Sequence, residues 1–275
     1  MSHNQNESTP DFAHLLLTRF NLDYSLTDGN PYICDEEWHQ ERFKLFFTFC
    51  LPSVKNQTCK DFTWLIFFNK NLKDVYQNHI EQIKNEVPQS VIVFVAPEDN
   101  HLEILKDYIR AELTTDRVVT SRFDNDDVLS CRYIELLQNF IQKKNNIKQR
   151  YLINAGTGYQ AEVNWPYRIG LVKNRSYSSF ITLVDSVQEN SIPETVLDKQ
   201  HQNWKNGIES LELTEDPVWI QIIHDYNLAN NITTTRLFIR IKPHLFKCYQ
   251  HPISKYKMKL LYPIQFFISL KNKVW

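Results

Sequence analysis

The chain has 275 residues, of which 42% are hydrophobic and 23% are charged, and its formal net charge is −1. This length and composition are typical of a globular protein with one domain, or one domain with an appendage. Only five glycines are present, and neither GxGxxG nor GxxxxGK[ST] occurs, which disfavours the glycine-rich dinucleotide-binding and P-loop sites. The five cysteines are scattered without a CxxC pair, which favours a reducing compartment, and no apolar run is long enough to cross a bilayer.

The first half of the chain alternates between strand-like and helix-like segments. Short runs of apolar and β-forming residues predict strands at 13–20, 62–68, 91–96 and 117–123. Apolar residues at helical spacing predict helices at 38–50 (interrupted by Pro52), 72–87, 102–113 and 133–144. Such an alternation predicts an α/β fold with a mainly parallel sheet.

The second half is less regular. Strands are predicted at 151–154, 161–165 and 179–184, and a helix at 218–226 that the Asp216-Pro217 pair would open. No internal repeat and no low-complexity linker divides the chain. The simplest organisation is one domain with a C-terminal extension from about residue 236.

The charge of the C-terminal end is strongly one-sided. After Asp225 the chain has no acidic residue and nine basic ones, interleaved with aromatic residues. Such a segment suits an anionic membrane surface, although a basic lobe packed on the acidic body of the same chain explains it equally well. No motif supports binding to nucleic acid.

Four polar side chains, Asp124, Asn125, Asp126 and Asp127, follow the fourth predicted strand. In an extended chain, side chains two positions apart share a face, so Asp124 and Asp126 are predicted to point the same way. Carboxylate pairs of this kind are hard oxygen ligands for Mg²⁺ or Mn²⁺. A surface turn that caps the next helix is the plainer alternative.

Two other chemistries fit the acidic segment less well. An EF-hand calcium loop fails because Leu129 stands where glycine is required. A phosphatase of the haloacid-dehalogenase type would use Asp124 as a nucleophile towards phosphorus, but no later GDxxxD pair accompanies it. A phosphatase, or a binding module without catalysis, nevertheless remains an alternative function.

Three segments together resemble the GT-A fold of nucleotide-sugar glycosyltransferases. They are LLTRFN at 16–21, the stretch from Leu51 to Phe67, and RFDNDDVL at 122–129. More narrowly, the chain resembles a bacterial family of rhamnosyltransferases, whose W-[LI]-Q-x-x-H pattern is similar to Trp219–His224 here. The family pattern continues with glycine, whereas this chain has Asp225. The resemblance covers about residues 12–230. It implies a GT-A domain at 12–235, with a Rossmann-like, mainly parallel sheet flanked by helices, and a basic aromatic extension at 236–275.

The resemblance also implies roles for individual residues. The metal ion, Mn²⁺ or Mg²⁺, would be held by Asp124, Asp126 and His224. The nucleotide sugar would be bound by Thr18, Arg19, Asn21, Arg122, Asp124 and Asp127. Asp216 would be the base that deprotonates the acceptor, although an Asp-Pro pair is also a common helix start, and Asp185, Glu189 and Asp225 compete for the role.

The implied function is a metal-dependent glycosyltransferase. It would move a sugar, rhamnose by the family description, from a nucleotide-diphosphate donor to a glycan or a lipid-linked acceptor. The expected location is the cytoplasm, with the basic extension resting on the inner surface of the membrane.

Overall fold

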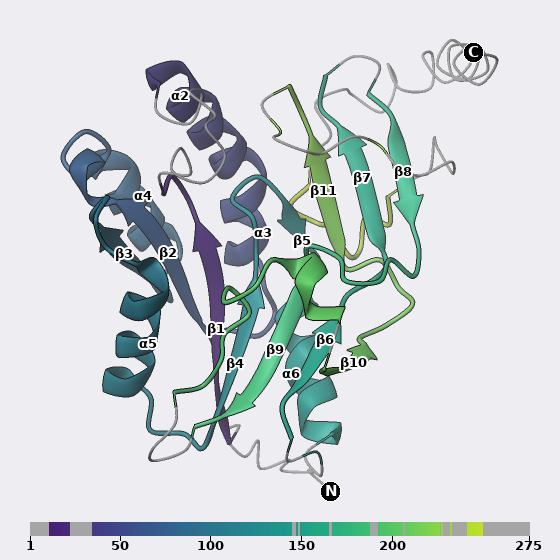
Figure 1. The fold of residues 1–275 in the computed structure, drawn as a ribbon. Coiled ribbons are helices and arrows are strands. Elements are labelled where there is room, and N and C mark those ends of the chain that lie inside the picture. The colour runs from purple at the N-terminus through teal and green to yellow at the C-terminus, as the bar shows by residue number, and fades with distance from the viewer. Residues whose placement is uncertain are drawn as a thin grey trace, which may run out of the picture.

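A seven-stranded sheet in the order β10-β6-β9-β4-β1-β2-β3 forms the centre of the structure (Figure 1). The structure is a computed structural model. It describes residues 11–22, 35–144, 147, 149–164, 167–187, 192–205, 207–225, 227, 232 and 241–249. The strands of the central sheet are β1 (Phe12–Arg19), β2 (Thr63–Asn69), β3 (Ser90–Val95), β4 (Arg117–Arg122), β6 (Tyr151–Asn154), β9 (Ile181–Ser186) and β10 (Glu209–Glu212).

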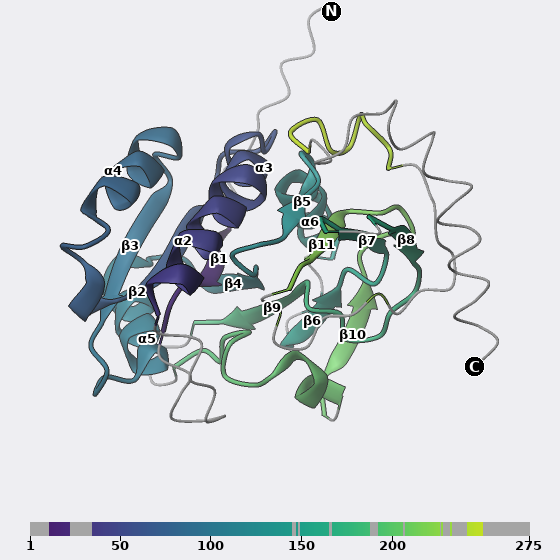
Figure 2. The same ribbon diagram turned by 90° about the horizontal axis from the view of Figure 1, so that it is seen from above.

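All neighbours in this sheet are parallel except β9, which runs antiparallel to both β4 and β6. The carboxyl ends of the other six strands therefore meet at one edge, which we call the carboxyl edge. Helices pack against the sheet, so the expected α/β architecture with a mainly parallel, helix-flanked sheet is confirmed (Figure 2).

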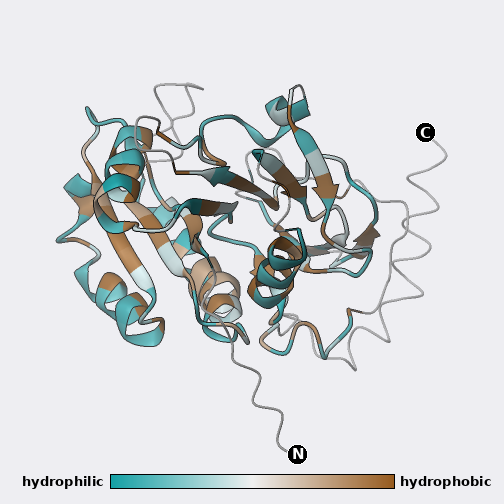
Figure 3. Cartoon of the chain, turned by 90° about the horizontal axis from the view of Figure 1, so that it is seen from below, coloured by the Kyte–Doolittle hydropathy of each residue, from teal (hydrophilic) through white to brown (hydrophobic). Residues whose placement is uncertain are grey.

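Two apolar clusters, one on each face of the central sheet, explain why the helices pack there. The helical elements are α2 (Glu36–Leu45), the π-type turn η2 (Phe46–Cys50), α3 (Leu51–Lys55), η3 (Lys70–Leu72), α4 (Gln77–Glu86), α5 (His101–Glu112), α6 (Tyr133–Lys143) and η4 (His201–Lys205). Side chains from α2, η2, α3, α4 and α6 share one cluster, and those of α5 and η4 share the other. The strands are largely hydrophobic, whereas the helices carry mixed surfaces, as amphipathic helices on a buried sheet do (Figure 3).

A second, four-stranded sheet lies beside the first, in the order β5-β11-β7-β8. Its strands are β5 (Val128–Leu129), β7 (Gly158–Glu162), β8 (Ile169–Val172) and β11 (Trp219–Ile223). Residues 241–249 pack on this sheet: Phe246 is only 2% exposed, and the carbonyl of Leu245 accepts a 2.9 Å hydrogen bond from the amide of Cys131. This part of the basic extension therefore belongs to the body of the protein.

The helix predicted at 218–226 is wrong, because Trp219–Ile223 form strand β11. Every residue of β11 is buried. A segment buried on both faces has no alternation of polar and apolar residues that would separate a strand from a buried helix. The β-branched Ile220, Ile222 and Ile223 fit the strand.

The helix expected to be interrupted at Pro52 continues past it. The π-type turn at Phe46–Cys50 lies just before α3, and Pro52 occupies the first turn of that helix. A proline is tolerated there, because the N–H groups of a first turn have no acceptor within the helix and the N–H that proline lacks is not needed. The predicted helix 72–87 is shorter than expected, since regular α-helix begins only at Gln77.

No helix in the described part of the chain is both long enough and apolar enough to span a membrane. Residues 236–240 and 250–275 of the predicted extension lie outside the described residues.

Candidate functional site

The acidic segment at 124–127 forms a turn at the carboxyl edge, directly after β4 and before β5. The amide of Asp127 points back to the carbonyl of Asp124 at 3.5 Å. The expectation that Asp124 and Asp126 share one face of an extended chain is therefore wrong, because the chain turns between them. Each carboxylate of the turn has its own set of partners.

Asp126 is held by a buried cluster of donors from distant parts of the chain. Its Oδ2 lies 2.6 Å from Nη1 of Arg42 in α2, 2.9 Å from Nε2 of His224 after β11, and 3.4 Å from Nδ2 of Asn227. Burial alone would raise the pKa of Asp126, but the positive charge of Arg42 and the hydrogen bond from His224 lower it to about 2. Asp126 is therefore a carboxylate at neutral pH.

Asp127 has a structural role. Its side chain is only 1% exposed, and Oδ1 accepts a 2.9 Å hydrogen bond from the amide of Ile222 in β11. Burial, followed by the negative charges of Asp126 and Asp124, raises the pKa of Asp127 well above its usual range. Its predicted place among the ligands of a nucleotide sugar has no support in this arrangement, since Asp127 joins β4 to β11 instead.

Asp124 is more open than its neighbours. Its side chain is 35% exposed and forms a forked ion pair with Arg122, whose Nη2 lies 3.1 Å from both carboxylate oxygens. Arg122 also lies 3.0 Å from Nδ1 of His201 in η4. Burial, and then the charge of Arg122, lower the pKa of His201 to about 4, so this histidine is neutral near pH 7.

The end of β1 is fastened to the acidic turn. Asn125 donates a 2.7 Å hydrogen bond from Nδ2 to the carbonyl of Phe20. Asn21 accepts from the amide of Asn69 and contacts Nε2 of His39, so it braces the ends of two strands and a helix.

Thr18 is fully buried, and its hydroxyl accepts from the indole N–H of Trp64 at 2.9 Å. Of the three residues predicted to meet the nucleotide from β1, Thr18 and Asn21 thus serve the scaffold. Arg19 is half-buried, and its charge acts on His101, whose pKa burial and Arg19 together lower to about 4.

A pocket opens at the carboxyl edge beyond β1, β2 and β3, on the side of β1 away from β4. It is lined by Leu22, Asn69, Val95, Ala96, Pro97, Asp99 and His101. Crevices outside the carboxyl ends of parallel strands are where α/β proteins bind nucleotides. No motif in the sequence pointed to Asn69 or His101.

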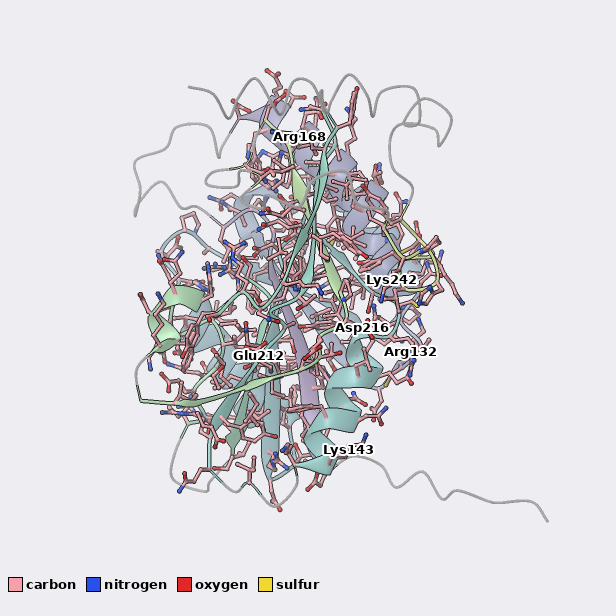
Figure 4. The ribbon with its side chains drawn as sticks, turned by 90° about the vertical axis from the view of Figure 1, so that its right-hand side faces the viewer. Arg132, Lys143, Arg168, Glu212, Asp216 and Lys242 are labelled. Carbon is pink, nitrogen blue, oxygen red and sulfur yellow. The ribbon has the colours of Figure 1, made fainter. Side chains whose placement is uncertain are left out.

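Asp216 lies away from the acidic turn. It pairs with Lys242 at 2.8 Å, and both side chains are well exposed. Asp216 precedes β11 and His224 follows it, and five residues of strand span roughly 16 Å. Glu162 lies opposite Ile223, the residue before His224, and forms an ion pair with Arg168, so Arg168 lies near the end of β11 that leads to His224. Figure 4 shows Arg168 far from Asp216 and Lys242. The prediction of Asp216 as the base therefore conflicts with the geometry.

The three predicted metal ligands do not form a metal site as they are arranged. Oδ2 of Asp126 already accepts from three donors, one of them a guanidinium, and Nε2 of His224 is turned onto Asp126. Among the described residues, no three His, Cys, Asp or Glu side chains are grouped as metal ligands. The donor chemistry thus does not fit Mn²⁺ or Mg²⁺ unless Arg42 and His224 move.

The comparison with known families decides the family of the chain. The family model described as "Putative rhamnosyl transferase" matches residues 12–236. The chain belongs to this family. No curated protein matches it.

Several solved structures show a distant similarity to this rhamnosyl transferase family member. Residues 1–349 of TarS from S. aureus in complex with UDP are 13% identical, with a TM-score of 0.42, over 77% of this chain and 60% of that one. A protein from Desulfovibrio desulfuricans described as a "putative nucleotide-diphospho-sugar transferase" is 13% identical, with a TM-score of 0.31, over 79% and 83% of the two chains. The inositol-1-phosphate CTP transferase from T. maritima is 10% identical, with a TM-score of 0.33, over 92% and 96%. These TM-scores are too low to support a conclusion about the chemistry of this chain.

Sequence reasoning missed one central residue of the site in this family member. Arg42 lies 84 positions before Asp126, in helix α2, and no motif in the sequence marks it. Arg42 is only 8% exposed, and the burial of one arginine cannot be read from a sequence.

Proposed function

We propose that this protein is a glycosyltransferase that moves a sugar from a nucleotide-diphosphate donor to a hydroxyl group of a glycan or a lipid-linked acceptor. Rhamnose is the sugar that the family description suggests. The observation that carries the proposal is the acidic turn of a rhamnosyl transferase family member, built at the carboxyl edge of a mainly parallel sheet. Such an edge is the usual nucleotide-binding place in α/β folds.

The proposed donor lies across this edge. The nucleoside would occupy the pocket beyond β1, β2 and β3, and the diphosphate would lie towards the acidic turn. Arg19 faces this region from the end of β1, and Arg122 lies at the end of β4. Both are suited to phosphate oxygens, because the planar guanidinium donates in pairs.

The base of the proposed reaction is Asp225. This carboxylate is exposed, adjoins His224 at the acidic-turn end of β11, and accepts a 2.6 Å hydrogen bond from Asn164. The competing Asp185 lies opposite Val118, near the amino end of β4 and so away from the acidic turn, and its oxygens accept hydrogen bonds from two backbone amides. Glu189 lies outside the described residues.

In the proposed reaction the acceptor oxygen forms a bond to the anomeric carbon, and the bond from that carbon to the diphosphate oxygen breaks. The electron pair leaves with the nucleoside diphosphate, and the acceptor proton passes to Asp225. A requirement for Mn²⁺ or Mg²⁺ stays a prediction of the sequence motif, and no step is assigned to a metal. Contact between the basic extension and an anionic membrane is likewise a proposal, and sedimentation with vesicles that contain phosphatidylserine tests it.

Binding of the donor is the direct test. A ligand that binds only the folded state raises the melting temperature, and saturation at about 100 times Kd stabilises by about 2.7 kcal/mol. We expect a nucleotide-diphosphate sugar to raise the melting temperature of the wild-type chain and of the control Asp107→Asn, whose carboxylate is 72% exposed on α5. We expect a smaller rise for Arg122→Gln, because this variant lacks a guanidinium that the proposal places at the diphosphate. If no nucleotide sugar shifts the wild-type melting temperature and none is turned over, the proposed function is wrong.

A further inference from the structure

The guanidinium of Arg42 lies against the acidic turn, at the carboxylate of Asp126 and the side-chain amide of Asn125. Its Nη1 is 2.6 Å from Oδ2 of Asp126 and 3.0 Å from Oδ1 of Asn125. The side chains of Arg42 and Asp126 are only 9% and 8% exposed. A fixed positive charge therefore sits against the central carboxylate of the motif and is largely shielded from water.

Arg42 leaves little room for a second cation. Three donors already converge on Oδ2 of Asp126, and two of them, His224 and Asn227, also contact each other at 3.0 Å. A divalent ion at this oxygen would have to displace the guanidinium, because two positive charges at one buried oxygen repel each other strongly. Trp38 also stabilises the position of Arg42, because the guanidinium lies over the indole ring, 4.9 Å from its centre.

One donor of Arg42 is not used. Its Nε is buried and has no hydrogen-bond partner among the described residues. A buried charged N–H without an acceptor is costly and rare in a folded protein. This donor beside the acidic turn therefore lacks an acceptor in the described part of the chain, and an oxygen from outside the chain reaches it only when the side chains that cover it move.

We propose that Arg42 is the resident cation of the acidic turn, taking at Asp126 the place that a divalent ion would need, and that its Nε–H binds an oxygen of the diphosphate of the donor. The second half of this inference rests on the proposed function. An arginine suits the role, because it stays charged at every accessible pH and offers several donors in one plane. The charge that develops on the departing diphosphate would then be stabilised by a preorganised group of the protein.

The first arm of the test measures Mn²⁺ alone. Mn²⁺ is titrated into the full chain and followed by its electron paramagnetic resonance signal, with wild type, Arg42→Gln and the control Lys44→Gln. Lys44 lies on the same helix, and its side chain is 70% exposed. We expect Arg42→Gln to bind Mn²⁺ at least about tenfold more tightly than wild type and Lys44→Gln, since Asp126 loses its bound cation. Equal Mn²⁺ affinity in wild type and Arg42→Gln overturns the inference.

The second arm measures binding of nucleoside diphosphates, UDP and dTDP, by calorimetry with EDTA or with Mn²⁺. We expect the wild-type Kd to differ by less than about twofold between the two conditions, and Arg42→Lys to weaken binding about tenfold with circular dichroism unchanged. Loss of wild-type binding in EDTA overturns the inference and leaves the proposed function standing. If wild type binds neither nucleotide in either condition, the proposed function and the diphosphate half fail, while the Mn²⁺ arm still decides the place of Arg42. The EDTA comparison needs no variant, so a variant that folds poorly does not block the test.

Discussion

The carboxylate of Asp126 and the guanidinium of Arg42 meet at 2.6 Å, although 84 residues separate them in the chain. This pair joins α2 to the turn after β4, and His224 adds the end of β11 to the same oxygen. Three elements from three parts of the sequence are thereby tied together at one atom. The site and the stability of the carboxyl edge consequently depend on the same contacts.

Removal of either partner of this pair should destabilise the protein. We expect Arg42→Gln and Asp126→Asn each to lower the free energy of unfolding by about 3–5 kcal/mol, because each leaves a buried charge unpaired. The double variant should lose clearly less than the sum, since it leaves no unpaired charge. Urea denaturation of the four proteins measures the coupling, and additive losses would show that the pair contributes no specific interaction.

The two candidate bases should differ in their effect on turnover. We expect Asp225→Asn to lower kcat by roughly a hundredfold or more, as loss of a general base does. Asp216→Asn should leave kcat nearly unchanged, because Asp216 is paired with Lys242 beyond the opposite end of β11. Initial rates with a nucleotide-sugar donor compare the two variants directly. A large loss in Asp216→Asn together with normal turnover in Asp225→Asn would reverse our assignment.

Gly158 should tolerate no side chain. A Cβ at this position would lie 2.1 to 2.4 Å from ring atoms of Trp219, whose indole stacks on Phe180 at 4.6 Å. We expect Gly158→Ala to lower the free energy of unfolding by about 3 kcal/mol, at the upper end of the cost of overpacking. In the background of Trp219→Phe, which leaves more room, the same change should cost less. Thermal denaturation checks both, and an equal cost in the two backgrounds would rule out the clash as the cause.

The stability of the protein should fall in mild acid, partly because of His14. Burial lowers the pKa of His14 to about 3, and its Nε2 contacts the hydroxyl of Ser121 at 2.8 Å. Below about pH 6.5 the unfolded chain binds a proton at this histidine, whereas the folded chain does so only near pH 3. His14 therefore does not destabilise the folded chain above about pH 6.5. Between about pH 6.5 and pH 3 it lowers the free energy of unfolding by up to ~1.4 kcal/mol for each unit that the pH falls.

Replacement of this histidine isolates its share. His101 and His201, each with a pKa lowered to about 4, add to the same acid sensitivity. His14→Gln keeps a polar group near Ser121 but cannot titrate, so its stability should depend less steeply on pH than that of wild type. Urea denaturation between about pH 7 and pH 5 measures the two slopes. Equal slopes for wild type and His14→Gln would mean that His14 binds its proton over the same pH range in the folded chain as in the unfolded chain, and would contradict the prediction.

Much of the fold could be predicted from local patterns. The strands at the centre of the sheet and helices α5 and α6 follow from runs of β-forming residues and from apolar spacing, because burial of one face selects the spacing. The acidic turn was found as a functional candidate for a similar reason, since four polar residues after a buried strand stand out from their surroundings. The sequence did not predict strand β11, because every residue of this strand is buried and no alternation of polar and apolar residues remains.

The sequence by itself determined the fold class and the acidic segment that follows the fourth strand and marks the candidate site. Only the tertiary structure decided which partners that segment has: Arg42 and His224 at Asp126, and Lys242 at Asp216 on the far side of β11. The physical reason is the range of the forces that leave a pattern in a chain. In a helix or strand with one buried face, apolar residues recur every few positions, so this pattern can be recognised within a short stretch of sequence. A charge pair across 84 residues depends on how whole elements pack against each other, and it produces no repeating pattern in the sequence.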